Sequence, residues 1–296
     1  MPTVNTPRPK KHLGQNFLQD QNLLAKIVRY ADLKPGEPVL EIGPGTGNLT
    51  EHLAAPGAQV LGLDSDPDVL AVATERFKNL SNVELRHQNV MKMDWCALIK
   101  EFAASNGAWA GQRPAPTNTI ISVVANIPYY ITSPILEKLA EVKDLLRQAV
   151  IMMQQEVGER LLAEPGTKAY GSLSVFLNYH FQIEKAFEVP RECFVPRPNV
   201  DSVVLRFVPC RRRDTGPRAP TDVDSEQMLF ALIRTAFWSR RKTFVNCIKS
   251  GPFIKAHLRP KVLEVYATMG WDARRRGETL TLGEFMGFAQ ALTSSS

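Results

Sequence analysis

The 296-residue sequence has few cysteines and no long apolar segment. No apolar run approaches the roughly 18 to 20 residues that a membrane-spanning helix needs, and Met1 to Lys11 lacks the apolar core of a signal peptide. The cysteines show neither CxxC spacing nor a His-paired ligand pattern, so we expect reduced thiols, no disulfide and no metal. They are Cys96, Cys193, Cys210 and Cys247. These absences predict a soluble, cytoplasmic protein with no membrane partner.

The composition provides apolar material for a large core and gives the chain an excess of positive charge. Hydrophobic residues make up 44% of the chain, which is enough for one large core and a smaller domain. The formal net charge of +6 favours a polyanionic partner, although any single basic cluster is equally well explained as solvated surface. Three of the four dense clusters follow residue 210: Arg211–Arg213, Arg240–Lys242 and Arg274–Arg276; the fourth is Lys10–Lys11.

Apolar runs separated by helix-length segments predict an α/β fold. A helix over Asp20 to Ala31 precedes the first run, and the alternation is typical of a doubly wound, mostly parallel sheet. The five runs are Pro38–Ile42, Gln59–Leu63, Val83–Leu85, Thr119–Ala125 and Ala149–Met153. Two later runs, Gln182–Val189 and Ser202–Val208, add edge strands, which brings the expected sheet to seven strands.

The strand pattern stops at a polar stretch rich in Pro and Arg, Pro209 to Asp224, where we place a domain boundary. Residues 1–209 are expected to form the larger α/β domain and residues 210–296 a smaller helical domain. An apolar stripe supports a helix in the second domain: Leu229, Leu232, Ile233, Ala236 and Phe237. Ser105 to Asn118, rich in Gly, Pro, Ala and Asn, is expected to be a surface insertion.

A glycine-rich turn follows the first strand. Val39 to Gly47 runs as a strand into G-x-G-x-G, and a helix begins near Asn48. Glycines such as Gly43 and Gly45 let the backbone approach a ligand, and the helix N-terminus adds partial positive charge. The sixth position of a dinucleotide-binding G-x-G-x-x-G loop would be Gly but is Asn48, and no phosphate-binding Lys-Ser/Thr follows.

Asp64, about twenty residues further at the end of the next strand, strengthens this nucleotide-site prediction. Its carboxylate can accept hydrogen bonds from ribose hydroxyls, although Ser65-Asp66-Pro67 is also typical of an exposed turn. The loop and this acid resemble the class I S-adenosylmethionine methyltransferases, whose sheet has one antiparallel strand. Their adenine-contacting acid usually ends the third strand, where this chain has Asn89. An asparagine oxygen accepts the same hydrogen bond without the charge, which predicts weaker cofactor binding.

The fourth strand carries Asn126-Ile127-Pro128-Tyr129 to the carboxyl edge of the sheet, where open α/β proteins bind ligands. An adenine amine is a poor nucleophile because its lone pair is delocalised. The Asn126 side-chain oxygen and the Pro128 carbonyl could each accept one of its N–H groups and aim the nitrogen at a methyl donor. Tyr129 would stack on the base. In isolation these four residues could equally form a strand-ending turn.

Six ordered blocks give the chain a specific resemblance to the KsgA type of small-subunit rRNA adenine dimethyltransferase. Besides the E-x-G-x-G-x-G loop and Asn126 to Pro134, they are Lys11–Leu18, Lys168–Ser174, Phe194–Ser202 and Ala236–Thr243. The resemblance implies that S-adenosylmethionine is the cofactor, that Asn16 and Leu18 close over it, and that four residues contact it: Gly43, Asp64, Asn89 and Asn126. It further implies that Phe194 sandwiches the target base opposite Tyr129; core packing is the alternative for this ring.

The same resemblance implies the substrate and the partners. Two adjacent adenines near the 3′ end of small-subunit rRNA would each receive two methyl groups within an immature ribosomal subunit, with the helical domain binding the RNA or ribosome. We expect a monomer and no DNA partner. Two alternatives remain open: the related large-subunit rRNA enzyme of the macrolide-resistance type, and a catalytically silent RNA- or DNA-binding factor on the same fold.

Overall fold

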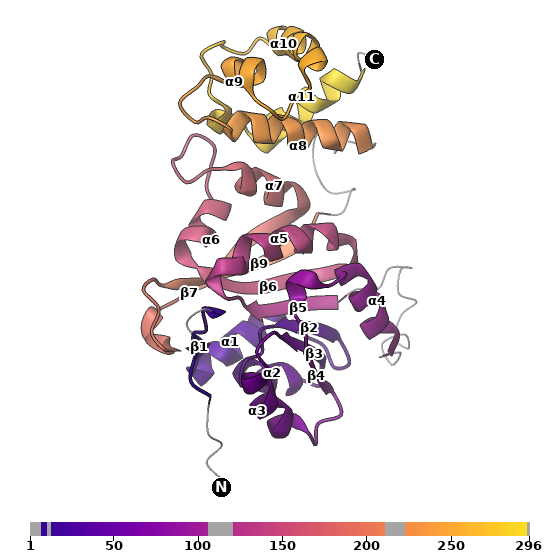
Figure 1. Cartoon of the computed structure of the whole chain (residues 1–296), viewed down its shortest axis with the longest axis vertical. Coiled ribbons are helices and arrows are strands. Elements are labelled where there is room, and N and C mark those ends of the chain that lie inside the picture. Colours follow the sequence, from indigo (N-terminus) through magenta and orange to yellow (C-terminus); the bar gives the residue numbers. More distant parts are fainter. Residues whose placement is uncertain (1–6, 11–12, 106–120, 211–222, 295–296) are drawn as a thin grey trace. The chain divides into compact units, whose positions relative to one another are not determined.

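The computed structural model describes residues 7–10, 13–105, 121–210 and 223–294 (Figure 1). The chain divides into two compact units, each composed of two segments of the sequence. Unit 1 comprises Met1–Gly158 and Gln182–Pro209, and unit 2 comprises Glu159–Phe181 and Cys210–Ser296. The chain passes from unit 1 into unit 2 for the second time between Pro209 and Cys210, which is where the sequence predicts the domain boundary. No signal in the sequence indicated that residues 159–181 group with the later helices.

Unit 1 is built on a seven-stranded sheet, in the order β4-β3-β2-β5-β6-β9-β7. The strands from β4 to β6 are parallel, and β9 runs antiparallel to β6. This confirms the doubly wound, mostly parallel α/β fold. The strands are β2 (Pro38–Ile42), β3 (Gln59–Asp64), β4 (Val83–His87), β5 (Ile121–Asn126), β6 (Leu146–Gln154), β7 (Phe181–Val189) and β9 (Ser202–Pro209). Residues 119 and 120 of the predicted fourth strand lie outside the described residues.

The two late strands do not both lie at the edge of the sheet. β7 is an edge strand, but β9 lies between β6 and β7, so the prediction of an edge position for β9 is wrong. The reason is visible in the burial of the two strands. The first four residues of β9, Ser202 to Leu205, are all buried, whereas exposed residues recur along β7. A continuous buried run is typical of a strand covered on both faces.

Helices cover both faces of this sheet. α1 (Gln21–Ala31) begins one residue after the predicted start at Asp20, whose carboxylate accepts hydrogen bonds from the N–H groups of Asn22 and Leu23. α1 and α2 (Asn48–Ala54) contribute apolar side chains to one core with alternate residues of the strands. α4 (Trp95–Ser105) and α5 (Thr132–Glu141) lie on the opposite side (Figure 1). α3 (Pro67–Phe77) packs beside β4.

A second, two-stranded sheet joins distant parts of unit 1. β1 (Phe17–Leu18) pairs antiparallel with β8 (Phe194–Val195), with Phe17 opposite Val195 and Leu18 opposite Phe194. Two-residue strands have no detectable period, so the sequence did not predict this pairing. Its consequence is that the N-terminal segment is fixed at the carboxyl edge of the main sheet.

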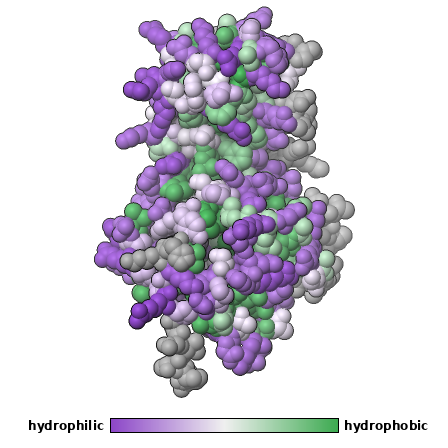
Figure 2. All heavy atoms as spheres, viewed as in Figure 1, coloured by the Kyte–Doolittle hydropathy of each residue, from purple (hydrophilic) through white to green (hydrophobic). Residues whose placement is uncertain are grey.

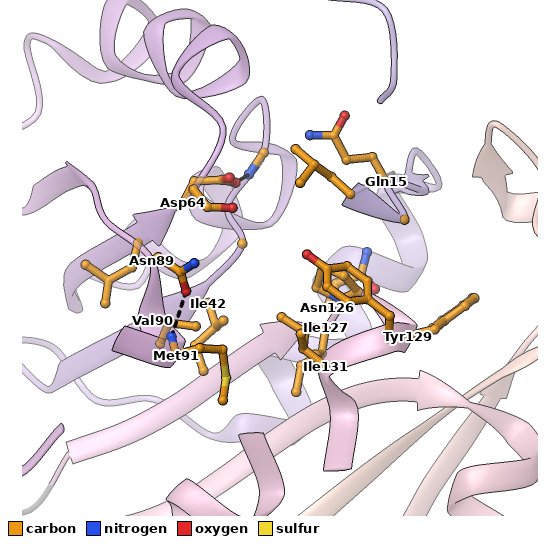
Figure 3. A pocket seen from close by; sticks show the side chains of 18 of the residues that line it. Gln15, Ile42, Asp64, Asn89, Val90, Met91, Asn126, Ile127, Tyr129 and Ile131 are labelled. Carbon is orange, nitrogen blue, oxygen red and sulfur yellow. Dashed lines mark hydrogen bonds between the residues drawn. The ribbon is translucent and has the colours of Figure 1, made fainter. Parts of the chain in front are cut away.

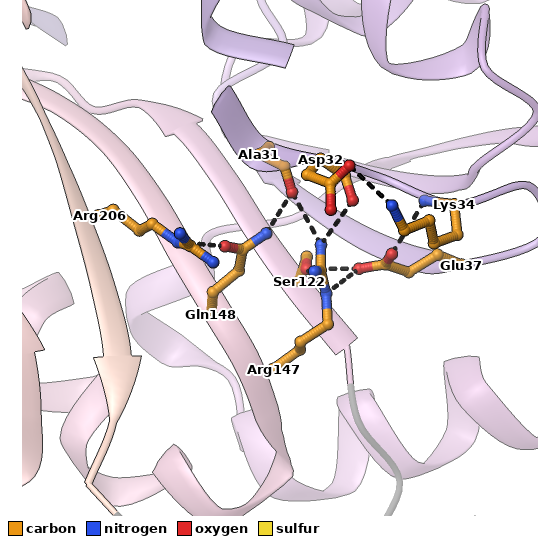
Figure 4. Close-up of polar contacts among 8 residues, drawn as sticks. All are labelled: Ala31, Asp32, Lys34, Glu37, Ser122, Arg147, Gln148 and Arg206. Atoms are coloured by element: carbon orange, nitrogen blue, oxygen red, sulfur yellow. Dashed lines mark hydrogen bonds and ion pairs between the residues drawn. The ribbon is translucent and has the colours of Figure 1, made fainter. Parts of the chain in front are cut away.

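The amino edge of the main sheet carries a polar network around Glu37 (Figure 4). The Glu37 side chain is 1% exposed and accepts hydrogen bonds from the Ser122 hydroxyl at 2.6 Å and from Arg147 Nε at 2.7 Å. Its other oxygen accepts the backbone N–H of Lys34 at 3.0 Å. Arg147 also donates to the Ala31 carbonyl at 2.8 Å. The network therefore links the end of α1 with the first residues of three strands.

Unit 2 is helical around its own apolar core. Its helices are α7 (Ser172–His180), α8 (Val223–Phe237), α9 (Phe244–Ser250), α10 (Arg259–Thr268) and α11 (Leu282–Ser294). The predicted stripe of α8 is confirmed, with Leu229, Leu232, Ile233 and Ala236 buried and Phe237 packed against the same core. Hydrophilic side chains are spread over the surface shown in Figure 2. Within the described ranges, no helix is both long and apolar enough to cross a membrane.

Candidate functional site

The carboxyl ends of β2, β3, β4 and β5 surround a cavity of about 910 Å³, which includes the solvent-open space at its mouth (Figure 3). Eight of the predicted site residues line it: Asn16, Gly43, Gly45, Asp64, Asn89, Asn126, Pro128 and Tyr129. The structure thus places the glycine loop, the ribose-type acid and the Asn126 motif around one space.

The glycine loop has a backbone that only glycine adopts without strain. Gly43 and Gly45 have φ values of +71° and +56°. A Cβ atom on Gly45 would lie 2.8 Å from the Phe17 ring, which is too close for any side chain. The loop is therefore shaped both by its own turn and by the N-terminal segment packed against it.

Asp64 ends β3 with both carboxylate oxygens facing backbone donors. Oδ2 accepts the N–H of Gly45 at 3.0 Å, and Oδ1 accepts the N–H of Asp66 at 2.9 Å. Burial raises the pKa of the Asp64 carboxyl, while these backbone hydrogen bonds act in the opposite direction. Each oxygen retains a second lone pair, so the carboxylate can still accept hydrogen bonds from a ligand's hydroxyl groups.

Asn89 lies at the predicted place after β4, with an exposed side chain that already has one partner. Its Oδ1 accepts the N–H of Met91 at 2.9 Å and caps the short 3₁₀ helix Val90–Lys92 (Figure 3). One lone pair of Oδ1 and the two N–H groups of Nδ2 are left for a ligand. Val90, Met91 and Leu63 add apolar wall beside it.

Asn126, the last residue of β5, has a defined side-chain orientation. Its Nδ2 donates to the backbone carbonyl of Asn16 at 3.2 Å. Because a carbonyl only accepts, the Asn126 atom that faces it must be the nitrogen, which leaves Oδ1 available to accept a hydrogen bond. The N-terminal segment therefore orients the amide on which the predicted chemistry depends.

Pro128 and Tyr129 complete this side of the cavity. The Pro128 carbonyl accepts the N–H of Ile131 at 3.1 Å and keeps a second lone pair. The Tyr129 ring lies beside Asn126 in Figure 3, and its hydroxyl lies 2.8 Å from the Ser202 hydroxyl. Burial raises the pKa of the Tyr129 phenol.

The structure places Leu18 and Phe194 in the core instead of in the main cavity. The Phe194 side chain is 2% exposed and Leu18 is 3% exposed, and both belong to the core beneath α1 and α2. Side chains alternate along β8, so Phe194 points inward while Val195 is 50% exposed. Leu18 instead lines a smaller adjoining hollow that also contacts Phe17, Gly43 and Asn126. In this arrangement Phe194 has no surface on which a base could stack.

Several site residues were not identified from the sequence. Gln15, Phe17 and Tyr130 also line the cavity. Gln15 Nε2 and Lys10 Nζ donate to the two oxygens of Asp66 at 2.7 and 2.6 Å, and Asp66 is 1% exposed. Asp66 thus anchors the N-terminal segment beside Asp64. The sequence indicated only a turn at Ser65-Asp66-Pro67, because no local pattern reports a partner more than fifty residues away.

Glu41, the acid of the glycine loop, is buried on the same side. It is 1% exposed and accepts one hydrogen bond, from the Thr50 hydroxyl at 2.6 Å. Burial, with a smaller contribution from Asp64, raises its pKa to about 8. Among the described residues, no three His, Cys, Asp or Glu side chains are grouped so that they could hold a metal ion.

The chain is similar to known proteins along nearly its whole length. Residues 7–282 match the family model described as ribosomal RNA adenine dimethylase. Proteins named ribosomal RNA small subunit methyltransferase A are 41% identical in Moorella thermoacetica and 40% identical in Geobacillus kaustophilus. Each similarity covers 96% of this chain, with 92% and 90% of the respective relatives.

Solved structures show the same fold. A dimethyladenosine transferase from Plasmodium falciparum superposes with a TM-score of 0.72 at 25% identity, covering 92% of this chain and 95% of that one. The 23S rRNA methyltransferase ErmE superposes with a TM-score of 0.65 at 22% identity, covering 94% of this chain and all of that one, which bears on the fold alone. With its glycine loop, Asp64 and Asn126 around one cavity, the chain belongs to the ribosomal RNA adenine dimethylase family.

Proposed function

We propose that this enzyme transfers methyl groups from S-adenosylmethionine to the N6 amines of two adjacent adenines near the 3′ end of small-subunit (16S) rRNA, during ribosome biogenesis. The family membership and the names of the relatives support methylation of ribosomal RNA. The observation that carries the proposal is the oriented Asn126 amide, which shares one cavity with the glycine loop and Asp64.

The cavity fits the proposed cofactor. The positive-φ glycines leave no Cβ atoms between the loop backbone and a ligand, and Asp64 retains lone pairs for two ribose hydroxyls. Asn89 lies where the adenine edge would bind, between apolar walls. Asn16, the backbone of Leu18 and Asn126 would enclose the amino-acid end. When bound, S-adenosylmethionine supplies an electrophilic methyl group.

The chain's own residues would position the acceptor amine. Asn126 Oδ1 and the second lone pair of the Pro128 carbonyl are the acceptors available for its two N–H groups. Hydrogen bonds to both would hold the nitrogen lone pair toward the methyl donor, which is catalysis by orientation without a general base. Tyr129 provides the surface on which the target base stacks. Phe194 would need to leave the core to contribute a second surface.

We assign the two units different roles. Unit 1 binds the cofactor and carries out catalysis. Unit 2 is proposed to bind RNA or the immature ribosomal subunit, because exposed cations follow one another on its surface: Arg241, Lys242, Arg274 and Arg276. Three arginines of this region also form ion pairs within the unit: Arg240 with Glu278, Arg275 with Glu284, and Arg274 with Asp272. We further propose that the enzyme acts as a monomer and has no DNA substrate.

The decisive experiment supplies tritiated S-adenosylmethionine to immature small ribosomal subunits that lack the modification. We expect label on adenine with the wild-type protein and a rate at least about 100-fold lower with Asn126→Ala. Asn22→Ala, an exposed asparagine of α1, is the matched control and should retain the wild-type rate. Label retained by Asn126→Ala would refute its role.

Two further arms separate the alternatives. In the first arm, naked large-subunit rRNA is the substrate in place of the small subunit. Efficient methylation of this RNA would identify the macrolide-resistance type of activity. Calorimetric titration of S-adenosylmethionine provides the other. Failure to bind it would identify a silent RNA- or DNA-binding factor.

A further inference from the structure

The backbone that carries the Tyr129 ring is fixed to the central sheet. Tyr129 opens a short 3₁₀ helix, Tyr129–Ile131, which is joined to β5 by Ile127 and Pro128. The N–H of Ile127 donates to the Met152 carbonyl at 3.2 Å, and the Thr132 hydroxyl donates to the Tyr129 carbonyl at 3.1 Å. One end of the ring is therefore held by the strand that delivers it.

The other end of the ring is held by Ser202. The two hydroxyl oxygens lie 2.8 Å apart, a short and favourable hydrogen-bond distance. Ser202 is 0% exposed, opens β9 and pairs with Gln154 of β6. The adjacent Asp201 is tied on both sides, since its carbonyl accepts the N–H of Gln155 at 3.0 Å and its carboxylate accepts the N–H of Arg191 at 3.0 Å. The partner of the Tyr129 hydroxyl is thus part of the rigid sheet.

The neighbouring Tyr130 provides a comparison, because its hydroxyl is not anchored in this way. Tyr130 lines the same cavity but is 58% exposed, and among the described residues its hydroxyl has no hydrogen-bond partner. Its ring instead lies close to Gly14 of the N-terminal segment, where an added Cβ atom would be 3.3 Å from it. Of two consecutive aromatic rings, one is fixed at both ends beside Asn126 and the other is anchored through its backbone alone.

Resting on the proposed function, we propose that Ser202 is a positioning residue for catalysis: it holds the Tyr129 ring in the plane on which the target adenine stacks. A base that stacks on a fixed ring is also fixed in height and tilt relative to the acceptors Asn126 Oδ1 and the Pro128 carbonyl. An untethered ring would allow the amine to move away from them. Orientation errors of about 1 Å are sufficient to reduce rates by large factors.

A double-mutant cycle tests this coupling. Tyr129→Phe keeps the ring and removes its hydroxyl, and Ser202→Ala removes only the partner. We expect each single variant to lower kcat about tenfold with little change in KM for the ribosomal substrate, because stacking area is retained while orientation is lost. The double variant should also lose about tenfold. A loss near a hundredfold would show independent effects and overturn the coupling.

Ser122→Ala is the matched control, because it also removes the hydroxyl of a buried serine. Ser122 is also 0% exposed and lies in the same sheet, but its hydroxyl donates to Glu37 at the amino edge. We expect it to lower thermal stability and to leave kcat unchanged. An equal loss of kcat in Ser122→Ala and Ser202→Ala would reduce the role of Ser202 to general stability. An unchanged kcat in Ser202→Ala would also overturn the proposal.

A readout that needs no catalysis separates this inference from the proposed function. With 3-fluorotyrosine incorporated at the six tyrosines, the ¹⁹F resonance of residue 129 is assigned by its loss in Tyr129→Phe. We expect one narrow resonance in the otherwise wild-type protein, a broadened or shifted one in Ser202→Ala, and no change in Ser122→Ala. Absence of methylation by the wild type would refute the proposed function, whereas an identical resonance in Ser202→Ala would refute the tether itself.

Discussion

The two ends of β2 each carry a buried glutamate, and their surroundings differ. Glu37, just before the strand, accepts hydrogen bonds from Arg147, Ser122 and the Lys34 backbone. Glu41, four residues later at the carboxyl edge, accepts one from Thr50 and has a pKa raised to about 8. The hydrogen bonds and the ion pair of Glu37 compensate for the burial of its carboxylate, whereas the single hydrogen bond of Glu41 leaves the cost of burying a charge there largely uncompensated. The amino edge is thus built for stability, and the carboxyl edge tolerates electrostatic cost around the cavity.

The sharpest test of this comparison replaces each glutamate by glutamine. Between pH 4.5 and about 8 the folded protein binds more protons at Glu41 than the unfolded chain does, so stability falls as pH rises through this window. Glu41→Gln removes that loss and should stabilise by up to about 4 kcal/mol at pH 8, with little gain near pH 4.5. Thermal unfolding across this pH range measures it. Glu37→Gln, its matched partner, should destabilise; stabilisation by both would remove the distinction.

The next largest effect concerns the cation of the amino edge. Arg147→Ala leaves the Glu37 carboxylate buried without its charged partner and removes one donor from the Ala31 carbonyl, which keeps the hydrogen bond from Gln148. We expect a loss of about 3 kcal/mol in the free energy of unfolding, with kcat and the cofactor Kd unchanged. Urea unfolding and methylation assays measure these. A marked fall in kcat at a temperature where the variant is folded would show that the amino edge influences the cavity.

Asp64→Asn tests the carboxyl edge, where we expect cofactor binding to change and stability to be retained, the reverse of Arg147→Ala. The amide preserves the shape and its oxygen can accept from Gly45, but its NH2 group then faces the N–H of Asp66, and the charge that binds ribose hydroxyls is lost. We expect the Kd of S-adenosylmethionine to rise about 30-fold, with thermal stability little changed, because the removal of a buried charge offsets the loss of the hydrogen bond from Asp66. Calorimetry and thermal unfolding measure the two quantities. Glu75→Gln, on the exposed side of α3, should change neither by a comparable amount.

Asn89→Asp should produce the smallest effect. An aspartate retains the oxygen that caps Val90–Lys92 and adds charge for an adenine amine. Because this side chain is exposed, solvent screens the added charge, and we expect S-adenosylmethionine to bind about threefold more tightly. Titration calorimetry resolves a change of this size. Weaker binding by Asn89→Asp would show instead that the asparagine N–H groups contact the base.

The parts of the fold that follow from local patterns were predictable. Alternating apolar runs predicted the strands, and the position of Asn126 after its strand placed it at the ligand-binding edge. The β1–β8 pairing, the interior place of β9 and the inward direction of Phe194 were not predictable. Each depends on contacts between residues distant in sequence. Ser202 and Asp66 likewise gain their significance from partners, Tyr129 and Lys10, that no local spacing identifies.

The pairing of Phe17 with Val195 also constrains the order in which the protein becomes competent during synthesis. The two residues are about 180 positions apart. The glycine loop and Asn126 emerge from the ribosome well before Val195, so until then the Asn16 carbonyl lacks the strand pairing that holds it against the Asn126 amide. A nascent or truncated chain ending before β8 would contain every predicted motif of the cofactor loop and catalytic strand without a finished site. We therefore expect the site to be complete only once β8 has been synthesised and can pair with β1.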